Sequence, residues 1–191
     1  MHDYCAEVGA LLQDLKQDQP FASPEVEAYL NLVRAADFLT REVSAVLKPH
    51  HLSEAQYNVL RILRGAGEAG HTCSDIAARL VTRDPDVTRL LDKLEARGWL
   101  TRARAPADRR VVRAHITAAG LTVLRTLDRP VRDAVARLLA HLPATKLRAL
   151  IELLELARAA PAATTRALDR PRAGLHVGQP ATCVGRGGET A

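Results

Sequence analysis

Basic side chains are concentrated in one stretch of this sequence, and their chemistry suits an anionic partner. Between Thr72 and Ile116, ten Lys and Arg residues stand against six Asp and Glu residues. The whole chain carries a formal net charge of +5. Guanidinium and ammonium groups bind phosphate oxygens and the acceptor atoms on base edges. The stretch therefore favours a polyanion, such as a nucleic acid, as the partner.

Enzymatic catalysis finds no support among the motifs of the sequence. The chain contains no Gly-rich phosphate loop, no nucleophile elbow and no HExxH metalloprotease pattern. We therefore expect neither an enzyme nor a bound cofactor.

Metal and thiol chemistry are disfavoured by residue spacing. Cys5, Cys73 and Cys183 lie far apart and form no CxxC pair, which predicts neither a disulfide scaffold nor a zinc ribbon. His50 and His51 have no companion residues at metal-ligand spacing, so we expect no metal site. An inert thiol is favoured at Cys5 and Cys73, and a redox-responsive cysteine is the alternative.

Two observations bear on location. No apolar run reaches the roughly 18 residues that a membrane span needs, and the first residues lack the basic and then apolar pattern of a signal peptide. Together with the cysteine usage, these observations predict a soluble cytoplasmic protein with no membrane partner.

Helical periodicity dominates the two long segments of the chain. A helix over 24–48 is predicted to begin after Ser23, with Pro24 at its first position. A length of about 36 Å exceeds what a small domain needs, so part of its apolar stripe is expected to face a partner subunit. A second long helix is predicted from Thr117 to about 141, kinked at Pro130, followed by a last helix from Pro143.

Between the long helices, start and stop signals predict three short helices and a hairpin. Ser53 and Thr72 each begin a capping pattern, and Asp84 followed by Pro85 predicts a third helix that ends at Gly98. Two strands are predicted over 99–104 and 111–116, joined by a basic loop over 105–110. This order is typical of a winged helix-turn-helix, so the predicted fold is mainly α with a small β wing.

Two linked stretches resemble the MarR family of transcription regulators. Residues 87–98 read VTRLLDKLEARG, and residues 108–110 read DRR, with Ile116-Thr117 and Gly120 following at the family's spacing. Within these stretches Ile116 departs from the family, in which a Leu is usual at that position. The resemblance covers about 26–157. It implies a homodimer joined by the first and the last two helices, with effectors bound between the dimerisation and DNA-binding parts.

The resemblance also implies roles for single residues. Thr88 and Arg89 match recognition-helix positions that touch phosphates and base edges, and Lys93 is counted with them. Asp108 and Arg110 match a wing pair in which the acid orients the hairpin and the arginine enters the minor groove. The role of Arg110 is also supported by electrostatics, because a narrow minor groove has an enhanced negative potential that attracts a guanidinium group.

Other charged residues receive weaker predictions. Arg109 is expected to meet a phosphate, and Arg97, Arg102 and Arg104 are expected to give only general electrostatic support. Asp86 departs from the small hydroxyl residue common in the family. It is either a helix-start residue, which is slightly favoured, or an acceptor for cytosine N4.

These observations predict the organisation of the chain. Residues 1–22 form an N-terminal extension that could join the dimerisation region, and 161–191 form a disordered tail. The domain spans 23–160, with its DNA-binding part over about 53–116 and dimerisation helices over about 23–48 and 117–158. Three leucines are expected in the dimer interface or its supporting core, namely Leu124, Leu150 and Leu154.

The function predicted is that of a sequence-specific regulator of transcription. We expect a homodimer that binds double-stranded DNA at a pseudo-palindromic operator, acts as a repressor and responds to a small-molecule effector. A redox-responsive regulator is one alternative. A winged-helix module for protein contacts and a helix-turn-helix-containing enzyme are alternatives from other classes.

Overall fold

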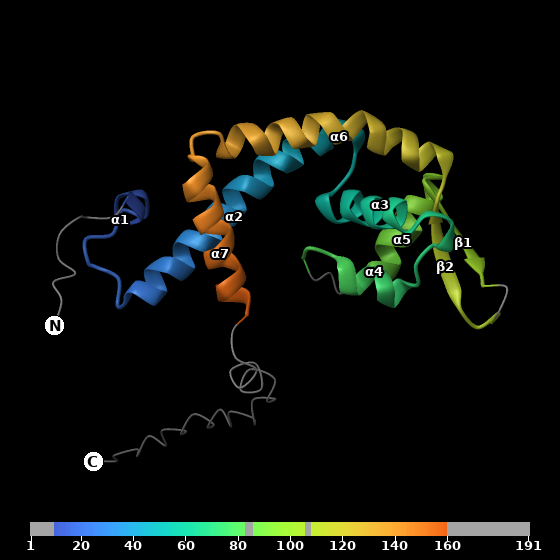
Figure 1. Ribbon diagram of the computed structural model, residues 1–191, viewed down its shortest axis with the longest axis horizontal. Coiled ribbons are helices and arrows are strands. Elements are labelled where there is room, and N and C mark those ends of the chain that lie inside the picture. The colour runs from blue at the N-terminus through green and yellow to red at the C-terminus, as the bar shows by residue number, and fades with distance from the viewer. Residues whose placement is uncertain (1–9, 83–85, 106–107, 160–191) are drawn as a thin grey trace, which may run out of the picture. The chain divides into compact units, whose positions relative to one another are not determined.

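The computed structural model describes residues 10–82, 86–105 and 108–159 of the 191-residue chain. In these ranges the fold is mainly α with one two-stranded antiparallel sheet, as predicted (Figure 1). The elements are α1 (Ala10–Asp14), α2 (Pro24–Leu47), a 3-10 turn η1 (Lys48–His50), α3 (Glu54–Ala66), a 3-10 turn η2 (Gly67–Ala69), α4 (Cys73–Arg79), α5 (Val87–Ala96), β1 (Leu100–Arg104), β2 (Val112–Ile116), α6 (Ala118–Leu139) and α7 (Ala144–Arg158).

The chain divides into two units, residues 1–141 and residues 142–191. The first unit holds α3, α4, α5 and the β1–β2 hairpin, which form the predicted winged helix-turn-helix, and α2 packs along α6. The second unit contains α7, which is described by itself. None of the helices in the described ranges is both long and apolar enough to cross a membrane.

Two of the three predicted capping patterns are confirmed by reciprocal hydrogen bonds. The Ser53 hydroxyl accepts from the Gln56 amide at 3.2 Å, while the Gln56 side chain accepts from the Ser53 amide at 3.0 Å. Thr72 and Asp75 form the same box, with distances of 3.1 Å in both directions. These bonds satisfy amide donors that the first turn of a helix otherwise leaves free.

The third helix start lies later than the sequence predicted. Asp84 and Pro85 fall outside the described residues, and Asp86 is the N-cap of α5, with its carboxylate accepting from the Arg89 amide at 2.9 Å. The predicted recognition helix over 84–98 is therefore wrong in its bounds, which are Val87–Ala96. Both Asp84 and Asp86 are good N-cap residues, so cap preference alone could not choose between them.

The core of the first unit is formed by apolar side chains from the helices and strands of the winged helix. Leu60, Leu63, Leu94, Leu100 and Leu124 are all fully buried. Their positions on α3, α5, β1 and α6 show that one core supports both the short helices and the start of a long one. Leu124 was predicted to lie in the dimer interface or in its supporting core, and it lies in the core.

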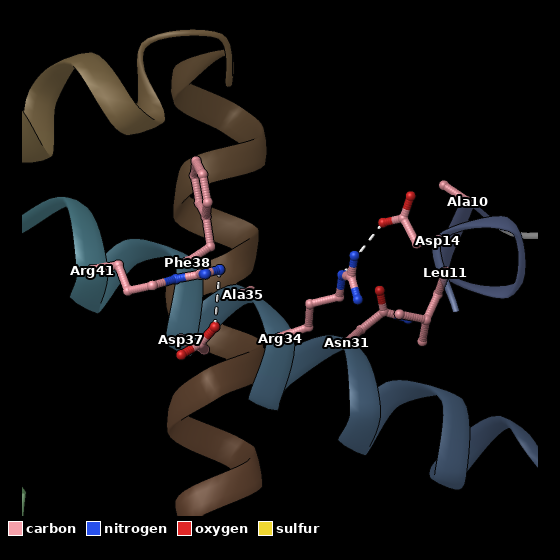
Figure 2. Close-up of a pocket in the computed structure, with 9 residues that line it drawn as sticks. All are labelled: Ala10, Leu11, Asp14, Asn31, Arg34, Ala35, Asp37, Phe38 and Arg41. Carbon is pink, nitrogen blue, oxygen red and sulfur yellow. Dashed lines mark ion pairs between the residues drawn. The ribbon is translucent and has the colours of Figure 1, made fainter. Parts of the chain in front are cut away.

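The N-terminal extension contributes a short helix beside α2. Leu11 of α1 is buried, and Asp14 lies 3.4 Å from Arg34 of α2 in an exposed ion pair (Figure 2). A second ion pair, between Arg41 and Asp37, borders the same hollow, which has a volume of about 660 Å³. Helix α1 spans Ala10–Asp14 of the N-terminal extension, and residues 1–9 lie outside the described ranges.

The long helices expose more apolar surface than a packed monomer core would leave. Only Leu47 is buried in the 24 residues of α2, and no residue of α7 is buried. Pro130 lies inside α6, which runs unbroken to Leu139 rather than to about 141. The predicted disordered tail lies outside the described residues.

Candidate nucleic-acid interface

The recognition helix α5 separates an apolar side from a polar side. Val87, Leu91 and Leu94 are buried against the core. Thr88 and Lys93 are exposed, and so is Arg89. The 3.6-residue period of the helix therefore turns three polar side chains away from the core.

Asp86 acts as the helix-start residue in this arrangement. Its carboxylate oxygen Oδ1 accepts the hydrogen bond from the amide of Arg89, 2.9 Å away. A carboxylate at this end also interacts favourably with the helix dipole. The geometry supports the interpretation of Asp86 as a cap over its interpretation as a base-reading residue.

A short hydrogen-bonded turn organises the tip of the wing. Strands β1 and β2 pair in register from Leu100 with Ile116 to Arg104 with Val112. Beyond them, the Asp108 carboxylate accepts from the Arg110 amide at 2.9 Å, and the Asp108 carbonyl accepts from the Val111 amide at 3.0 Å. This Asx-type turn fixes the backbone from which the Arg110 side chain projects.

Arg102 holds the wing to the recognition helix. Its Nε donates to Glu95 Oε2 at 2.8 Å and its Nη2 donates to Asp92 Oδ1 at 2.6 Å, while its amide donates to Glu95 Oε1 at 3.0 Å. The hydrogen bonds from Arg102 lower the pKa of the Glu95 carboxyl, and the two carboxylates raise the pKa of Arg102. The prediction of general electrostatic support for Arg102 missed this contact.

A signal for this contact was present in the sequence. Asp92 and Glu95 are three residues apart, so they share one side of α5, and they precede a basic strand. What the sequence did not give was the register that places Arg102 of β1 opposite them.

The basic residues of this region divide into committed and uncommitted side chains. Arg79 pairs with Asp75, Arg113 donates to the Gly70 carbonyl at 3.3 Å, and Arg97 and Arg102 bond elsewhere in the chain. Within the described residues, by contrast, an uncommitted set forms no ion pair and no side-chain hydrogen bond, namely Arg89, Lys93, Arg104, Arg109 and Arg110. The predicted site residues other than the two acids and Thr88 all belong to the uncommitted set.

Thr88 has a neighbour from the preceding helix. The sulfur of Cys73, at the start of α4, lies 3.8 Å from the Thr88 hydroxyl, and Cys73 is an exposed free thiol. The structure thus brings the first residue of α4 beside the polar side of α5. Cys5 and Cys183 lie outside the described residues.

Comparisons with known proteins identify the family. The family model named MarR family matches residues 52–112, which include α3, α4, α5 and β1. A crystal structure of a MarR transcription factor from Planctomyces limnophilus is 42% identical, with a TM-score of 0.55 over 72% of this chain and 99% of that one. The chain belongs to the MarR family. The resemblance predicted from the two sequence motifs is therefore confirmed.

Curated proteins similar to this chain are named transcription regulators. An HTH-type transcriptional repressor of Mycobacterium tuberculosis is 31% identical over 124 residues, which cover 65% of this chain and 88% of the repressor. Two uncharacterized HTH-type regulators of Bacillus subtilis are 34% identical, and the chain spans 60% and 66% of their lengths.

Proposed function

We propose that this MarR-family protein is a cytoplasmic, sequence-specific regulator that binds double-stranded DNA as a homodimer. It acts as a repressor, and a small molecule modulates its DNA binding. Asp86, Thr88, Arg89 and Lys93 are assigned to the major-groove element, with Asp86 as its cap. The wing is assigned to the minor groove and the adjacent phosphates through Arg110 and Arg109, with Asp108 as the residue that orients it.

The observation that carries this proposal is the division of the basic side chains. In a region rich in carboxylates, Arg89 and Lys93 of α5 and Arg109 and Arg110 of the wing form no ion pair within the described residues. Uncommitted cations on a helix and on a neighbouring hairpin match what a major groove and its flanking phosphates require. A module for protein contacts has no need of a cationic hairpin tip.

A regulator with the same fold supports the choice of partner. Sco3205 from Streptomyces coelicolor was crystallised in complex with DNA, and it shares 22% identity and a TM-score of 0.66 with this chain. The half-sites of the operator are proposed to lie about 10–10.5 bp apart, because a two-fold dimer presents its recognition helices one helical turn apart.

The apolar surface of the long helices supports the homodimer. Val26, Tyr29 and Val33 repeat at helical spacing along α2 and are 41%, 64% and 50% exposed. On α7, Ile151 is 51% exposed and Leu154 is 36% exposed. Exposed apolar stripes of this kind mark surfaces that contact another molecule. In a symmetric dimer, the stripe of one subunit packs against the same stripe of the other subunit.

A cavity beside the C-terminal end of α2 supports a small-molecule effector. Its volume is about 480 Å³, and its lining combines cationic and apolar side chains, namely Arg41, Ser44, Ala45, Lys48, His51 and Leu52. Ligand pockets commonly have volumes of about 300–1,000 Å³ and an apolar lining with a few polar or charged groups. CouR from Rhodococcus jostii, which shares the fold at 23% identity, was crystallised with p-coumaroyl-CoA.

Selection of bound DNA from a random pool, followed by titration of the selected sequence, tests the proposed function. With about 6–10 phosphate contacts, the affinity should fall about 10³- to 10⁵-fold between 50 and 200 mM salt. Arg110→Ala should weaken DNA binding. It should also reduce the steepness of the plot of log affinity against log salt concentration, here called the salt slope, by about one, while sedimentation shows an intact dimer. Arg129→Ala is the matched control, because Arg129 is an exposed arginine of α6. Recovery of no preferred sequence, or unchanged affinity in Arg110→Ala, would contradict the proposal.

A charge placed in the apolar stripe tests the dimer. Tyr29→Asp should shift the protein to monomer in sedimentation velocity, because the carboxylate would be buried without a partner. Thr101→Asp places the same charge on an exposed position of β1, outside the proposed dimerisation helices, and should leave the dimer intact. A stable dimer in Tyr29→Asp would assign the stripe on α2 to another partner.

A further inference from the structure

Arg97 lies at the C-terminal end of α5 and bonds to a segment far away in the sequence. Its Nη1 donates to the His51 carbonyl at 2.8 Å, and its Nη2 donates to the His50 carbonyl at 3.0 Å. The guanidinium also stacks over the Trp99 ring, with 3.5 Å between its central carbon and the ring centroid. One side chain therefore joins the recognition helix to the connection between α2 and α3.

The backbone at the end of α5 creates the platform for this stack. Gly98 adopts a φ of 70°, and its amide donates to Glu95 at 2.8 Å, while the Trp99 amide donates to Leu94 at 3.0 Å. This pair of bonds is the Schellman motif, which reverses the chain after a helix and requires a left-handed residue. The reversal brings Trp99 back beneath the guanidinium of Arg97.

The acceptor segment is itself a fixed turn. Helix α2 ends at the fully buried Leu47, the turn η1 follows, and His51 adopts a left-handed φ of 51° before the buried Leu52. The His51 amide donates to the Lys48 carbonyl at 2.9 Å. With both ends anchored in the core, the carbonyls of His50 and His51 offer a rigid pair of acceptors to a planar guanidinium.

We propose that Arg97 is a positioning residue for DNA recognition that acts without contacting DNA. It fixes the C-terminal end of α5 to the connection between α2 and α3, so that the exposed side of α5 is presented at a set angle to α2. This role rests on the proposed DNA binding. It differs from that of Arg109, whose uncommitted side chain is assigned to a phosphate.

The salt dependence of DNA binding separates positioning from phosphate contact. In Arg97→Ala we expect the affinity for the selected DNA to fall roughly tenfold or more, because two charged hydrogen bonds are lost, with no change in the salt slope. Arg109→Ala is the matched control and should lower the slope by about one. A lower slope in Arg97→Ala would make Arg97 a phosphate contact and overturn the proposal.

A conservative variant gives an independent readout. Arg97→Lys keeps the charge but lacks the planar pair of donors, so it should bind DNA as weakly as Arg97→Ala, at an unchanged slope. Full affinity in Arg97→Lys would show that charge alone suffices and would overturn the proposal. If Arg97→Ala does not fold, the lysine variant decides the question by itself.

The sole tryptophan of the chain reports the contact without DNA. Trp99 is the only Trp in the sequence, so its emission and its quenching by acrylamide describe this position alone. Arg97→Ala should shift the emission and increase the quenching, because the stacked cation no longer covers the ring. Identical spectra and quenching would show that the clamp does not form and would overturn the proposal. If wild-type protein binds no DNA, the proposed function and the role in recognition fall together, whereas the spectra still establish the contact.

Discussion

The two ends of α5 are built in opposite ways. At its start, Thr88 and Arg89 are exposed, and the Arg89 side chain forms no ion pair within the described residues. At its end, Arg97 bonds to the connection after α2, and the Gly98 carbonyl accepts from the Thr117 hydroxyl at the start of α6 at 2.7 Å. Binding side chains keep a productive geometry when packing and hydrogen bonds around them hold their element in place, and the bonds at the end of α5 give this support to the exposed side chains at its start.

The comparison also sorts the arginines by task. Arg97 and Arg102 lie in the most basic part of the sequence, yet the guanidinium groups of both donate hydrogen bonds to other residues of the same chain. Arg109 and Arg110 lie on the wing and form no ion pair within the described ranges. Net charge therefore overstates the number of cations that are available to a polyanion.

The largest expected contrast between the two ends is in stability. Leu94 is fully buried near the end of α5, so Leu94→Ala should lower the free energy of unfolding by about 2–5 kcal/mol through lost packing and a cavity. Arg89→Ala near the start of α5 should change it by less than about 0.5 kcal/mol while weakening DNA binding. Urea titration of both variants, with m-values compared, measures the contrast.

Equal destabilisation by Leu94→Ala and Arg89→Ala would contradict the difference between the two ends of α5. Leu11→Ala supplies a second reference, because Leu11 is buried beside α2 and away from α5. It should lower stability and leave the DNA affinity of the remaining folded protein unchanged.

A smaller loss of stability is expected for a substitution near the start of α6. A Cβ on Gly120 would overlap the Trp99 carbonyl oxygen, which also accepts from the Thr117 amide at 3.0 Å. Gly120→Ala should therefore lower the free energy of unfolding by about 1–3 kcal/mol, because backbone atoms must move apart. Gly65→Ala is the control, since a Cβ at Gly65 meets nothing within 4 Å. Thermal melts in which Gly120→Ala is no worse than Gly65→Ala would refute the close approach.

The features that the sequence predicted well are local. Ser53 with Gln56 and Thr72 with Asp75 are three residues apart, so their bonds follow from cap chemistry. The helical periods, the hairpin and the family motifs also depend on nearby residues.

The features that the sequence did not predict are tertiary. The acceptors of Arg97 lie 46 and 47 residues away, and the partners of Arg102 face it only once β1 is in place beside α5. Spacing along the chain places two carboxylates on one side of α5 but does not show which distant residue meets them, so both arginines were assigned to general electrostatic support. The start of α5 was misplaced because two aspartates compete for the cap.

The next prediction concerns the start of α5 and its cap residue, Asp86. Asp86→Ala should cost about 0.5–2 kcal/mol of stability, whereas Asp86→Asn should cost little, because Asn caps as well as Asp. If Asp86 is only the cap, the asparagine variant selects the same DNA sequence as wild type. A changed preference at a single C·G pair would show that the carboxylate also accepts from cytosine N4.

The smallest expected effect concerns pH at the contact between α5 and the wing. Arg102 holds the pKa of the Glu95 carboxyl below its usual value of 4.5, so this pair contributes stability above that pH and loses it as the pH falls through the folded-state pKa. Arg102→Met should therefore flatten the acid limb of the stability profile relative to wild type. The difference at neutral pH should be below about 1 kcal/mol, since the pair is partly exposed.

Urea titrations at a series of pH values from neutral to acid measure this difference. Arg129→Met is the matched control, because it removes an exposed arginine from a pair with Asp133 on α6 and should leave the acid limb unchanged. If Arg102→Met has the same acid limb as wild type but loses DNA affinity, Arg102 is a DNA contact rather than an anchor. In that case the division between the two ends of α5 holds at Arg97 and Gly98 but does not extend to the wing.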